Sequence, residues 1–341
     1  MSDTPPKERI PLGERLTGAL LLLPIVLARL LPYRWRIAFG GWVTARVIAP
    51  LVGYDRRVRE NLALVFPDMP PDEVARIVRG VSDNAGRSMI ELMSPEFIRR
   101  NAHPPCSGPG LEPLRRAQAE GRPAIVISAH LANFNAARLG LISSGLRIAC
   151  FYRALRNRFF NAHYVRAMEA VSAPILEQNR AGVMQMVRHL RQGGTLAIMN
   201  DLNAQDGVPL DFFGKPALTS LSAAELALKY HAPLVPVWSR RLENGLDFEV
   251  FFEEEIPHTD PLTMTREFNR RLEARVRAAM DQWFWIHRRW KDGDNAFGAM
   301  RARELERLER RLAERRRADG SAPDAPRRAG SADAAAKGGT R

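Results

Sequence analysis

A histidine stands where an apolar, β-rich run of the chain ends, and its position suits proton transfer. The run covers residues 124–129 and leads directly into His130, with Asn135 after four intervening residues. A histidine at the carboxyl end of a buried strand, entering a turn that opens a helix, can project its imidazole into a crevice lined by free backbone N–H groups. Such a site could deprotonate a hydroxyl and stabilise an oxyanion, which is the chemistry of acyl transfer. A purely structural role is the alternative for a histidine in this place.

The spacing of His130 and Asn135 resembles the H-x-x-x-x-D/E signature of glycerolipid-type acyltransferases, which implies that Asn135 would orient the His130 ring. Its amide carbonyl can accept a hydrogen bond from Nδ1–H, but it supplies no charge to stabilise an imidazolium. Precedents point both ways, because Cys-His-Asn proteases work with an amide, whereas replacing the Asp of a Ser-His-Asp triad by Asn costs about four decades of rate. Asp201 follows a second apolar run, residues 195–199, and is a source of the charge that Asn135 lacks. The alternative for Asp201 is a helix N-cap.

Arg153 follows a third apolar run, residues 146–151, with Tyr152 before it. A guanidinium at the end of a strand could bind a phosphate or stabilise a developing oxyanion. The alternative for Arg153 is an ordinary surface arginine.

Three tryptophans and three cations crowd into residues 282–291. This composition suits cation–π stacking and a boundary between polar and apolar surroundings. The alternative is a helix end whose aromatic side chains fill the core.

Several segments together resemble the bacterial lipid A biosynthesis (lauroyl/myristoyl) acyltransferase family, within the lysophospholipid/glycerolipid acyltransferase superfamily. Residues 282–291 are similar to its W-x-W-x-H-x-R-W-K ending, and His130 begins its H-x-x-x-x-D/E signature. The resemblance covers residues 10–292 and departs from the family at Asn135, where an acid is usual, and at Leu202, where glutamine is usual. The other matching blocks are residues 57–62 with 66–67 (R-x-x-x-N-L and F-P), Tyr152-Arg153, Asp201, and residues 208–217 (F-F-G-x-P-A).

The resemblance implies a reaction and a set of site residues. A fatty acyl chain would pass from a thioester on acyl carrier protein or coenzyme A to a hydroxyl of a lipid A precursor, with no cofactor and no covalent acyl-enzyme. His130, Asn135, Arg153 and Asp201 would be catalytic. Substrate-binding residues would be Tyr152, Phe212, Phe213, Gly214 and Arg289. The alternatives are another glycolipid or aminolipid acceptor, and a non-catalytic lipid-binding relative.

The charge balance predicts an acidic partner. The chain holds 51 Lys and Arg against 38 Asp and Glu, a formal net charge of +13. Anionic membrane lipid, a phosphorylated glycolipid, acyl carrier protein and nucleic acid all fit this charge. Nucleic acid is disfavoured, because the sequence lacks zinc-finger spacing, an RNP-like motif and a P-loop. The histidines and the two cysteines, Cys106 and Cys150, show no metal-ligand spacing, so no metal site is predicted.

The amino-terminal apolar segment, residues 16–28, is 13 residues long before Arg29. A bilayer span needs about 20 residues, so an interfacial anchor or short hairpin is favoured over a true span or a buried core helix. No small-residue cleavage site follows, which disfavours a signal peptide. The basic flanks favour the cytoplasmic side, and the family implies the bacterial inner membrane.

The periodicity predicts a layered α/β acyltransferase core with an N-terminal membrane-associated helical segment and a disordered C-terminal tail. Apolar runs near residues 124, 147, 195, 234 and 247 alternate with helical patterns at 133–144, 180–193 and 218–231, and a long helix is expected over 262–282. The loop at residues 103–110 reads as a linker. The expected organisation is a helical region at 1–100, the core at 101–292, a charged amphipathic helix at 293–317 and a disordered tail at 318–341.

Overall fold

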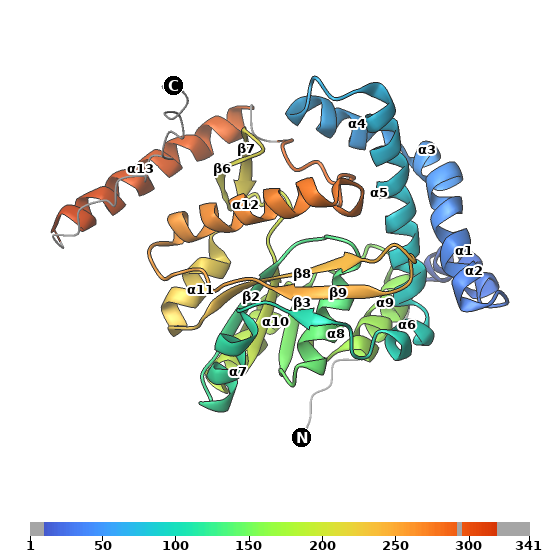
Figure 1. Ribbon diagram of the computed structural model, residues 1–341, viewed down its shortest axis with the longest axis horizontal. Coiled ribbons are helices and arrows are strands. Elements are labelled where there is room, and N and C mark those ends of the chain that lie inside the picture. The colour runs from blue at the N-terminus through green and yellow to red at the C-terminus, as the bar shows by residue number, and fades with distance from the viewer. Residues whose placement is uncertain (1–9, 292–294, 319–341) are drawn as a thin grey trace, which may run out of the picture.

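A computed structural model describes residues 10–291 and 295–318 of the 341-residue chain. The predicted layered α/β core is confirmed, because a largely parallel sheet lies between layers of helices (Figure 1). The predicted disordered tail lies outside the described residues, apart from Ala318.

The main sheet has seven strands in the order β1-β9-β8-β2-β5-β3-β4. The five strands from β8 to β4 are parallel, whereas β9 runs antiparallel to β8 and pairs in parallel with β1 at the edge. The strands are β1 (Cys106–Ser107), β2 (Ala124–Ser128), β3 (Ile148–Tyr152), β4 (Ile175–Glu177), β5 (Thr195–Met199), β8 (Leu234–Arg241) and β9 (Phe248–Phe252). A separate antiparallel hairpin is formed by β6 (Val208–Phe212) and β7 (Lys215–Thr219).

Alternate residues of the central strands pack on opposite layers of helices, as the two-residue period of a strand requires. In β2, Ile125 and Ile127 pack with α10 and α11, whereas Ala124 and Val126 pack with α7 and α8. The helix α9 joins the second layer through contacts with α8 and β4. These helices are α7 (Leu111–Ala119), α8 (Phe134–Ser143), α9 (Arg158–Val171), α10 (Arg180–Arg191) and α11 (Ser222–Tyr230).

The N-terminal part is helical and lies at one end of the molecule (Figure 1). Its elements are α1 (Leu12–Ala28), α2 (Tyr33–Val43), a π-helical turn (Thr44–Ile48), α3 (Ala49–Val52), α4 (Tyr54–Val65), α5 (Pro71–Leu92) and α6 (Pro95–Arg100). Within the described residues, no single helix has the length and apolarity to cross a bilayer, although the bent pair Tyr33–Val52 and Tyr54–Val65 meets those criteria together, with an 82° bend.

The chain finishes with two long helices, α12 (Pro261–Ala278) and α13 (Ala296–Ala318). A 3₁₀ turn, Met280–Gln282, follows α12 and leads into the tryptophan-rich segment. Figure 1 shows α13 at the end of the molecule opposite α1–α3.

Two local expectations differ from the structure. The stretch 103–110 is not only a linker, because Cys106 and Ser107 form edge strand β1. The helix expected over 262–282 ends at Ala278, where Ala279 leaves helical geometry.

Candidate active site

His130 and Asp201 form a hydrogen-bonded pair at the carboxyl edge of the sheet. The His130 Nδ1 atom lies 2.8 Å from Asp201 Oδ1, and the His130 backbone N–H donates to Asp201 Oδ2 at 2.8 Å. The Asp201 side chain is fully buried, whereas the His130 side chain is 24% exposed. The carboxylate is therefore held inside the protein, and the imidazole can reach solvent or a substrate.

The sheet topology explains why residues 71 positions apart meet here. The strand β2 ends two residues before His130, β5 ends two residues before Asp201, and the two strands are parallel neighbours. After β2 the chain continues through α8 to β3, which lies beyond β5 in the sheet. After β5 it continues through the hairpin to β8, which lies on the other side of β2. Such a switch point leaves a crevice outside the carboxyl ends of the strands, the usual ligand position in open α/β sheets.

Asp201 is stabilised as a carboxylate by three donors. Besides the two His130 groups, Trp283 Nε1 donates to Asp201 Oδ2 at 2.9 Å. Burial by itself would raise the pKa of Asp201, but the neighbouring His130 charge and these hydrogen bonds outweigh it, so its pKa lies below the ordinary value. Asp201 is consequently an anion that can hold the imidazole in one tautomer and stabilise an imidazolium.

The turn after β2 is fixed by its own backbone N–H groups. The N–H of Leu131 donates to Ala129, and that of Ala132 donates to Gln282. Ala132 has a φ of 51°, a left-handed conformation that L-residues rarely adopt, and its carbonyl accepts from Asn84 at 3.1 Å. The N–H groups of residues 130–132 thus hold the turn and are not the free donors that the sequence predicted.

Asn135 does not take the predicted position beside His130. It lies in the first turn of α8, 2% exposed, and its amide donates to Asn133 Oδ1 at 3.1 Å. Its own Oδ1 accepts from Arg138 Nη1 at 2.7 Å. The orienting contact expected of Asn135 is made by Asp201, so the substituted acid position belongs to a buried network around Arg138.

Asn133 links that network to a second buried charge pair. Its Nδ2 donates to Glu91 at 2.9 Å, and Glu91 forms a double hydrogen bond with Arg241 of β8. The Glu91 side chain is fully buried and that of Arg241 is 7% exposed. The turn that carries His130 is therefore fastened to both α5 and β8.

Tyr152 and Arg153 lie at the same edge of the sheet as His130. Strand β3, which ends at Tyr152, is the neighbour of β5 on the side away from β2. The Tyr152 side chain is half-buried against a core cluster beneath α9, whereas Arg153 is exposed. Arg153 thus follows the strand next to the one that ends before Asp201, and it is exposed at that edge.

The family model for "Bacterial lipid A biosynthesis acyltransferase" matches residues 14–292, most of the chain. The chain belongs to the bacterial lipid A biosynthesis acyltransferase family. It is similar to the lipid A biosynthesis acyltransferase of Haemophilus influenzae, 24% identical over 82% of this chain and 88% of the relative. It is also similar to the lipid A biosynthesis lauroyltransferase of Escherichia coli, 24% identical over 69% and 78%, and to the phosphatidylinositol mannoside acyltransferase of Mycobacterium tuberculosis, 22% identical over 53% and 58%. The protein is accordingly an acyltransferase.

The three tryptophans of the carboxyl-terminal segment lie in the core of this acyltransferase. Trp283, Trp285 and Trp290 are 2%, 0% and 7% exposed. Trp283 stacks edge-on against Trp285 at 4.6 Å between ring centroids, and Trp290 Nε1 donates to the Phe212 carbonyl at 3.1 Å. The predicted polar–apolar boundary is not where these rings lie, and one of them instead supports Asp201.

Phe212, Phe213 and Arg289 also lie in this aromatic core, at 0%, 5% and 1% exposure. Arg289 donates to the Leu218 carbonyl and the Thr219 hydroxyl, and burial lowers its pKa to about 10, against the opposing effect of Asp201. No exposed surface of these three side chains supports the predicted contact with substrate. Gly214 is exposed at the turn of the hairpin, with a φ of 72°.

Residues that the sequence analysis left without a role hold the tryptophan segment in place. Asn61, in the R-x-x-x-N-L block, donates to the carbonyls of Trp285 and His287 at 2.7 and 2.8 Å. His287 Nε2 accepts from the Asn203 N–H at 2.9 Å, and burial lowers the pKa of His287 to about 4. The family spacing pointed to both segments, but no sequence signal showed that they touch.

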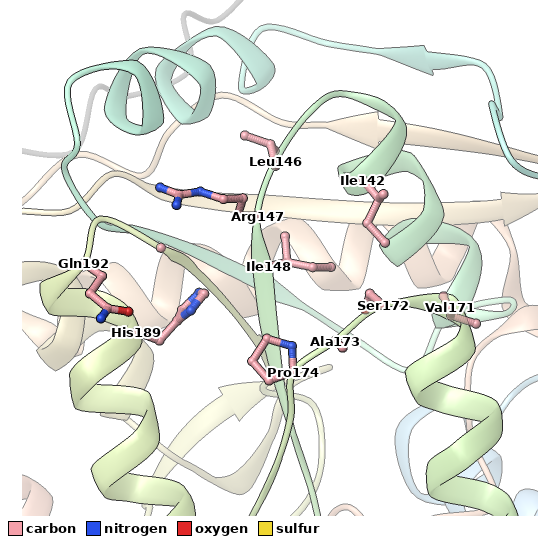
Figure 2. Close-up of a pocket in the computed structure, with 11 residues that line it drawn as sticks. Ile142, Leu146, Arg147, Ile148, Val171, Ser172, Ala173, Pro174, His189 and Gln192 are labelled. Atoms are coloured by element: carbon pink, nitrogen blue, oxygen red, sulfur yellow. The ribbon is translucent and has the colours of Figure 1, made fainter.

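A cavity of 440 Å³ lies at the opposite, amino edge of the sheet. Figure 2 shows Arg147, His189 and Pro174 around it, next to the start of β3 and the carboxyl ends of α9 and α10. The cavity contains none of the predicted site residues, so the sheet separates it from the His130–Asp201 pair.

Proposed function

We propose that this acyltransferase moves a fatty acyl chain from a thioester of acyl carrier protein to a hydroxyl of a lipid A precursor at the cytoplasmic face of the bacterial inner membrane. The observation that carries the proposal is the His130–Asp201 pair, a partly exposed imidazole oriented by a buried carboxylate in a chain of this family.

His130 would act as the general base through Nε2. With Nδ1–H donating to Asp201, the lone pair of the neutral ring lies on Nε2. That nitrogen would take the proton of the acceptor hydroxyl as its oxygen attacks the thioester carbonyl. The new C–O bond forms, the C–S bond breaks, and the imidazolium returns its proton to the leaving thiolate. Asp201 would stabilise the imidazolium between these steps.

Arg153 would bind a phosphate of the acceptor or donor, or stabilise the oxyanion formed at the thioester carbonyl. Its exposed guanidinium beside the end of β5 supports either use. The backbone N–H groups of residues 130–132 already hold the turn, so the Arg153 guanidinium is a better candidate than these three groups to stabilise the oxyanion.

An apolar surface on the N-terminal helices supports membrane attachment. We call it the N-terminal apolar face; its exposed side chains are Leu12, Leu16, Leu20, Leu27, Trp35, Phe39, Trp42 and Leu51. Arginines 34, 46 and 56 are exposed among them. Apolar and aromatic side chains beside cations are the composition of a helix that lies in the interface of an anionic membrane.

The second candidate for the acceptor is another glycolipid. The similarity to a phosphatidylinositol mannoside acyltransferase favours this alternative, because relatives of this chain are named for different lipid acceptors. A non-catalytic lipid-binding relative is less well supported, because the base and its carboxylate are both in place.

The test is transfer of a labelled acyl group from acyl carrier protein to a lipid A precursor in detergent, with His130→Ala as the comparison. The unmodified protein is expected to transfer the label, and His130→Ala to lose at least about 10³-fold in rate while still binding the precursor. Precursor binding by both proteins with transfer by neither would favour the binding relative or another acceptor.

A further inference from the structure

The outer face of α10 carries cations and no acids. We call this the α10 face; it consists of Arg180, Val183, Met184, Arg188 and Arg191. All five side chains are exposed, with Val183 at 47% and Met184 at 63%. Steps of three and four residues place Arg180, Met184, Arg188 and Arg191 along one side of the helix. The helix contains no Asp or Glu.

The arginines of the α10 face have no acidic partner in the part of the chain that the structure describes. Among the described residues, no carboxylate forms an ion pair with Arg180, Arg188 or Arg191, and Glu177, just before the helix, forms none either. Several exposed arginines elsewhere do have such partners. On α12, Arg270 pairs with Glu267 and Arg275 with Glu253, and α13 interleaves its arginines with four glutamates.

Helix electrostatics explain only part of this pattern. Arg188 and Arg191 lie near the carboxyl end of α10, where the helix dipole favours cations. Arg180 is the first residue of the helix, where the dipole disfavours a cation. Arg180 therefore weakens the isolated helix and adds to a positive potential that an external acidic group would relieve.

The α10 face begins at the edge of the sheet that carries His130. Arg180 follows β4, Arg153 follows β3 and Asp201 follows β5, and these strands are neighbours in the order β5-β3-β4. At the usual strand spacing, β4 lies about 10 Å from β5. Arg188 and Arg191 lie toward the opposite edge. A partner that covers the α10 face would therefore reach the crevice at its Arg180 end, with Arg153 between Arg180 and His130.

A protein fits this surface better than a bilayer. The N-terminal apolar face packs on α9 through α1, and α9 covers the face of the sheet opposite α10. In β4, Ile175 packs toward α9 and Leu176 toward the layer of α10. Figure 1 shows α10 well apart from α1–α3. Two apolar side chains within a cationic row match an acidic helix with a small apolar contact.

We infer that the α10 face is the docking surface for an acidic protein that carries the acyl thioester. The inference rests on the proposed function, because it assigns the donor to a carrier protein. Docking there would let a thioester on a flexible arm pass Arg153 to reach His130.

The experiment measures binding of fluorescent holo acyl carrier protein to the full chain in detergent at low and high salt. The variant is Arg180→Gln/Arg188→Gln/Arg191→Gln. Its matched control, Arg303→Gln/Arg307→Gln/Arg310→Gln on α13, lowers the net charge by the same amount, from +13 to +10 (13 − 3). Met184→Asp is a second variant at an exposed position, which removes an apolar side chain and adds a negative charge to the cationic row without removing an arginine.

The unmodified protein and the α13 variant are expected to bind with equal, salt-sensitive affinity, and the α10 variant about tenfold or more weakly. Met184→Asp is expected to weaken binding several-fold, with unfolding temperatures unchanged. The inference is overturned if both charge variants bind the carrier protein equally well or if the unmodified protein does not bind it. It is also overturned if the α10 variant keeps its affinity for the carrier protein and loses only its binding to phosphatidylglycerol vesicles. Binding of the carrier protein does not require catalysis. Failure of the proposed function would therefore be seen in a different experiment, as acyl transfer that does not change in His130→Ala.

Discussion

At the scale of the residue, His130, the proposed base, takes its carboxylate partner from the end of another strand. Asn135, five residues after His130, lies inside α8, and its side chain accepts a hydrogen bond from Arg138 one turn later in the helix. Asp201 instead reaches Nδ1 from the end of the neighbouring strand. The loss of an acid at position 135 therefore leaves the charge beside His130 intact.

Replacing Asn135 tests this separation. We expect Asn135→Asp to keep the transfer rate within about threefold, because the new carboxylate would face the buried Arg138 guanidinium. Asn135→Leu is expected to lower the free energy of unfolding by about 1–3 kcal/mol, because it leaves Arg138 and Asn133 short of a buried hydrogen bond. Transfer kinetics and urea unfolding measure both effects. A rise of tenfold or more in Asn135→Asp would show that position 135 acts on His130 after all.

At the scale of the element, the sequence predicted the long strands and the layers between them. Continuous apolar runs identified β2, β3, β5, β8 and β9, because strands buried on both faces have little polar alternation. It did not show β4, with three residues, or β1, with two, since such short strands carry too little pattern. The β6–β7 hairpin was not predicted, because Pro209 and Pro216 each lie in one of its strands and proline argues against a strand.

Only the site residues that directly follow a predicted strand could be predicted from the sequence. His130, Arg153 and Asp201 each follow an apolar run, so their common edge was accessible from the sequence. The choice of Asp201 over Asn135 depends on which strands are neighbours, and the order of strands is not written in local spacing. The aromatic blocks were recognisable, but an exposed tryptophan and a buried one look alike in sequence.

The segment Trp283–Trp290 should make stability depend on pH through His287. Its pKa is about 4 in the fold, against about 6.5 for an unfolded chain. Between these values the unfolded chain binds the proton more readily, so stability is complete above about pH 6.5 and is lost as the pH falls toward 4. Allowing for partial exposure, we expect a loss of about 1–2 kcal/mol at pH 5.

The variant His287→Gln isolates this effect. Glutamine can accept the Asn203 N–H but does not titrate, so the difference in unfolding free energy between pH 7 and pH 5 should shrink by that amount. Urea unfolding at the two pH values makes the comparison. An equal pH dependence in both proteins would mean that His287 is not a buried neutral base.

At the scale of the whole molecule, the features proposed for lipid and carrier binding lie on different sides of one core. The N-terminal apolar face is joined to the sheet through α9, and the α10 face lies on the other layer. Both layers end at the edge that carries His130. A lipid acceptor and a protein donor could thus approach the same crevice without competing for one surface.

The N-terminal apolar face is tested by vesicle binding. Trp35 and Trp42 are 66% and 55% exposed, so Trp35→Glu/Trp42→Glu should leave the fold stable and lower partitioning into phosphatidylethanolamine/phosphatidylglycerol vesicles about tenfold or more. The control is Met300→Glu on α13, at 51% exposure. Equal partitioning of the two variants would place the membrane contact elsewhere.

The most direct test of the account is the acyl-transfer rate of Asp201→Asn, compared with the unmodified protein at equal precursor occupancy. An amide at 201 has one accepting oxygen, so it can keep the bonds from Trp283 and the His130 backbone N–H but then turns its own N–H₂ toward Nδ1, and it supplies no charge to an imidazolium. We predict a fall of about 10³–10⁴-fold in rate with precursor binding and unfolding temperature preserved. Transfer within tenfold of the unmodified protein would contradict the central claim that Asp201 supplies the charge for His130.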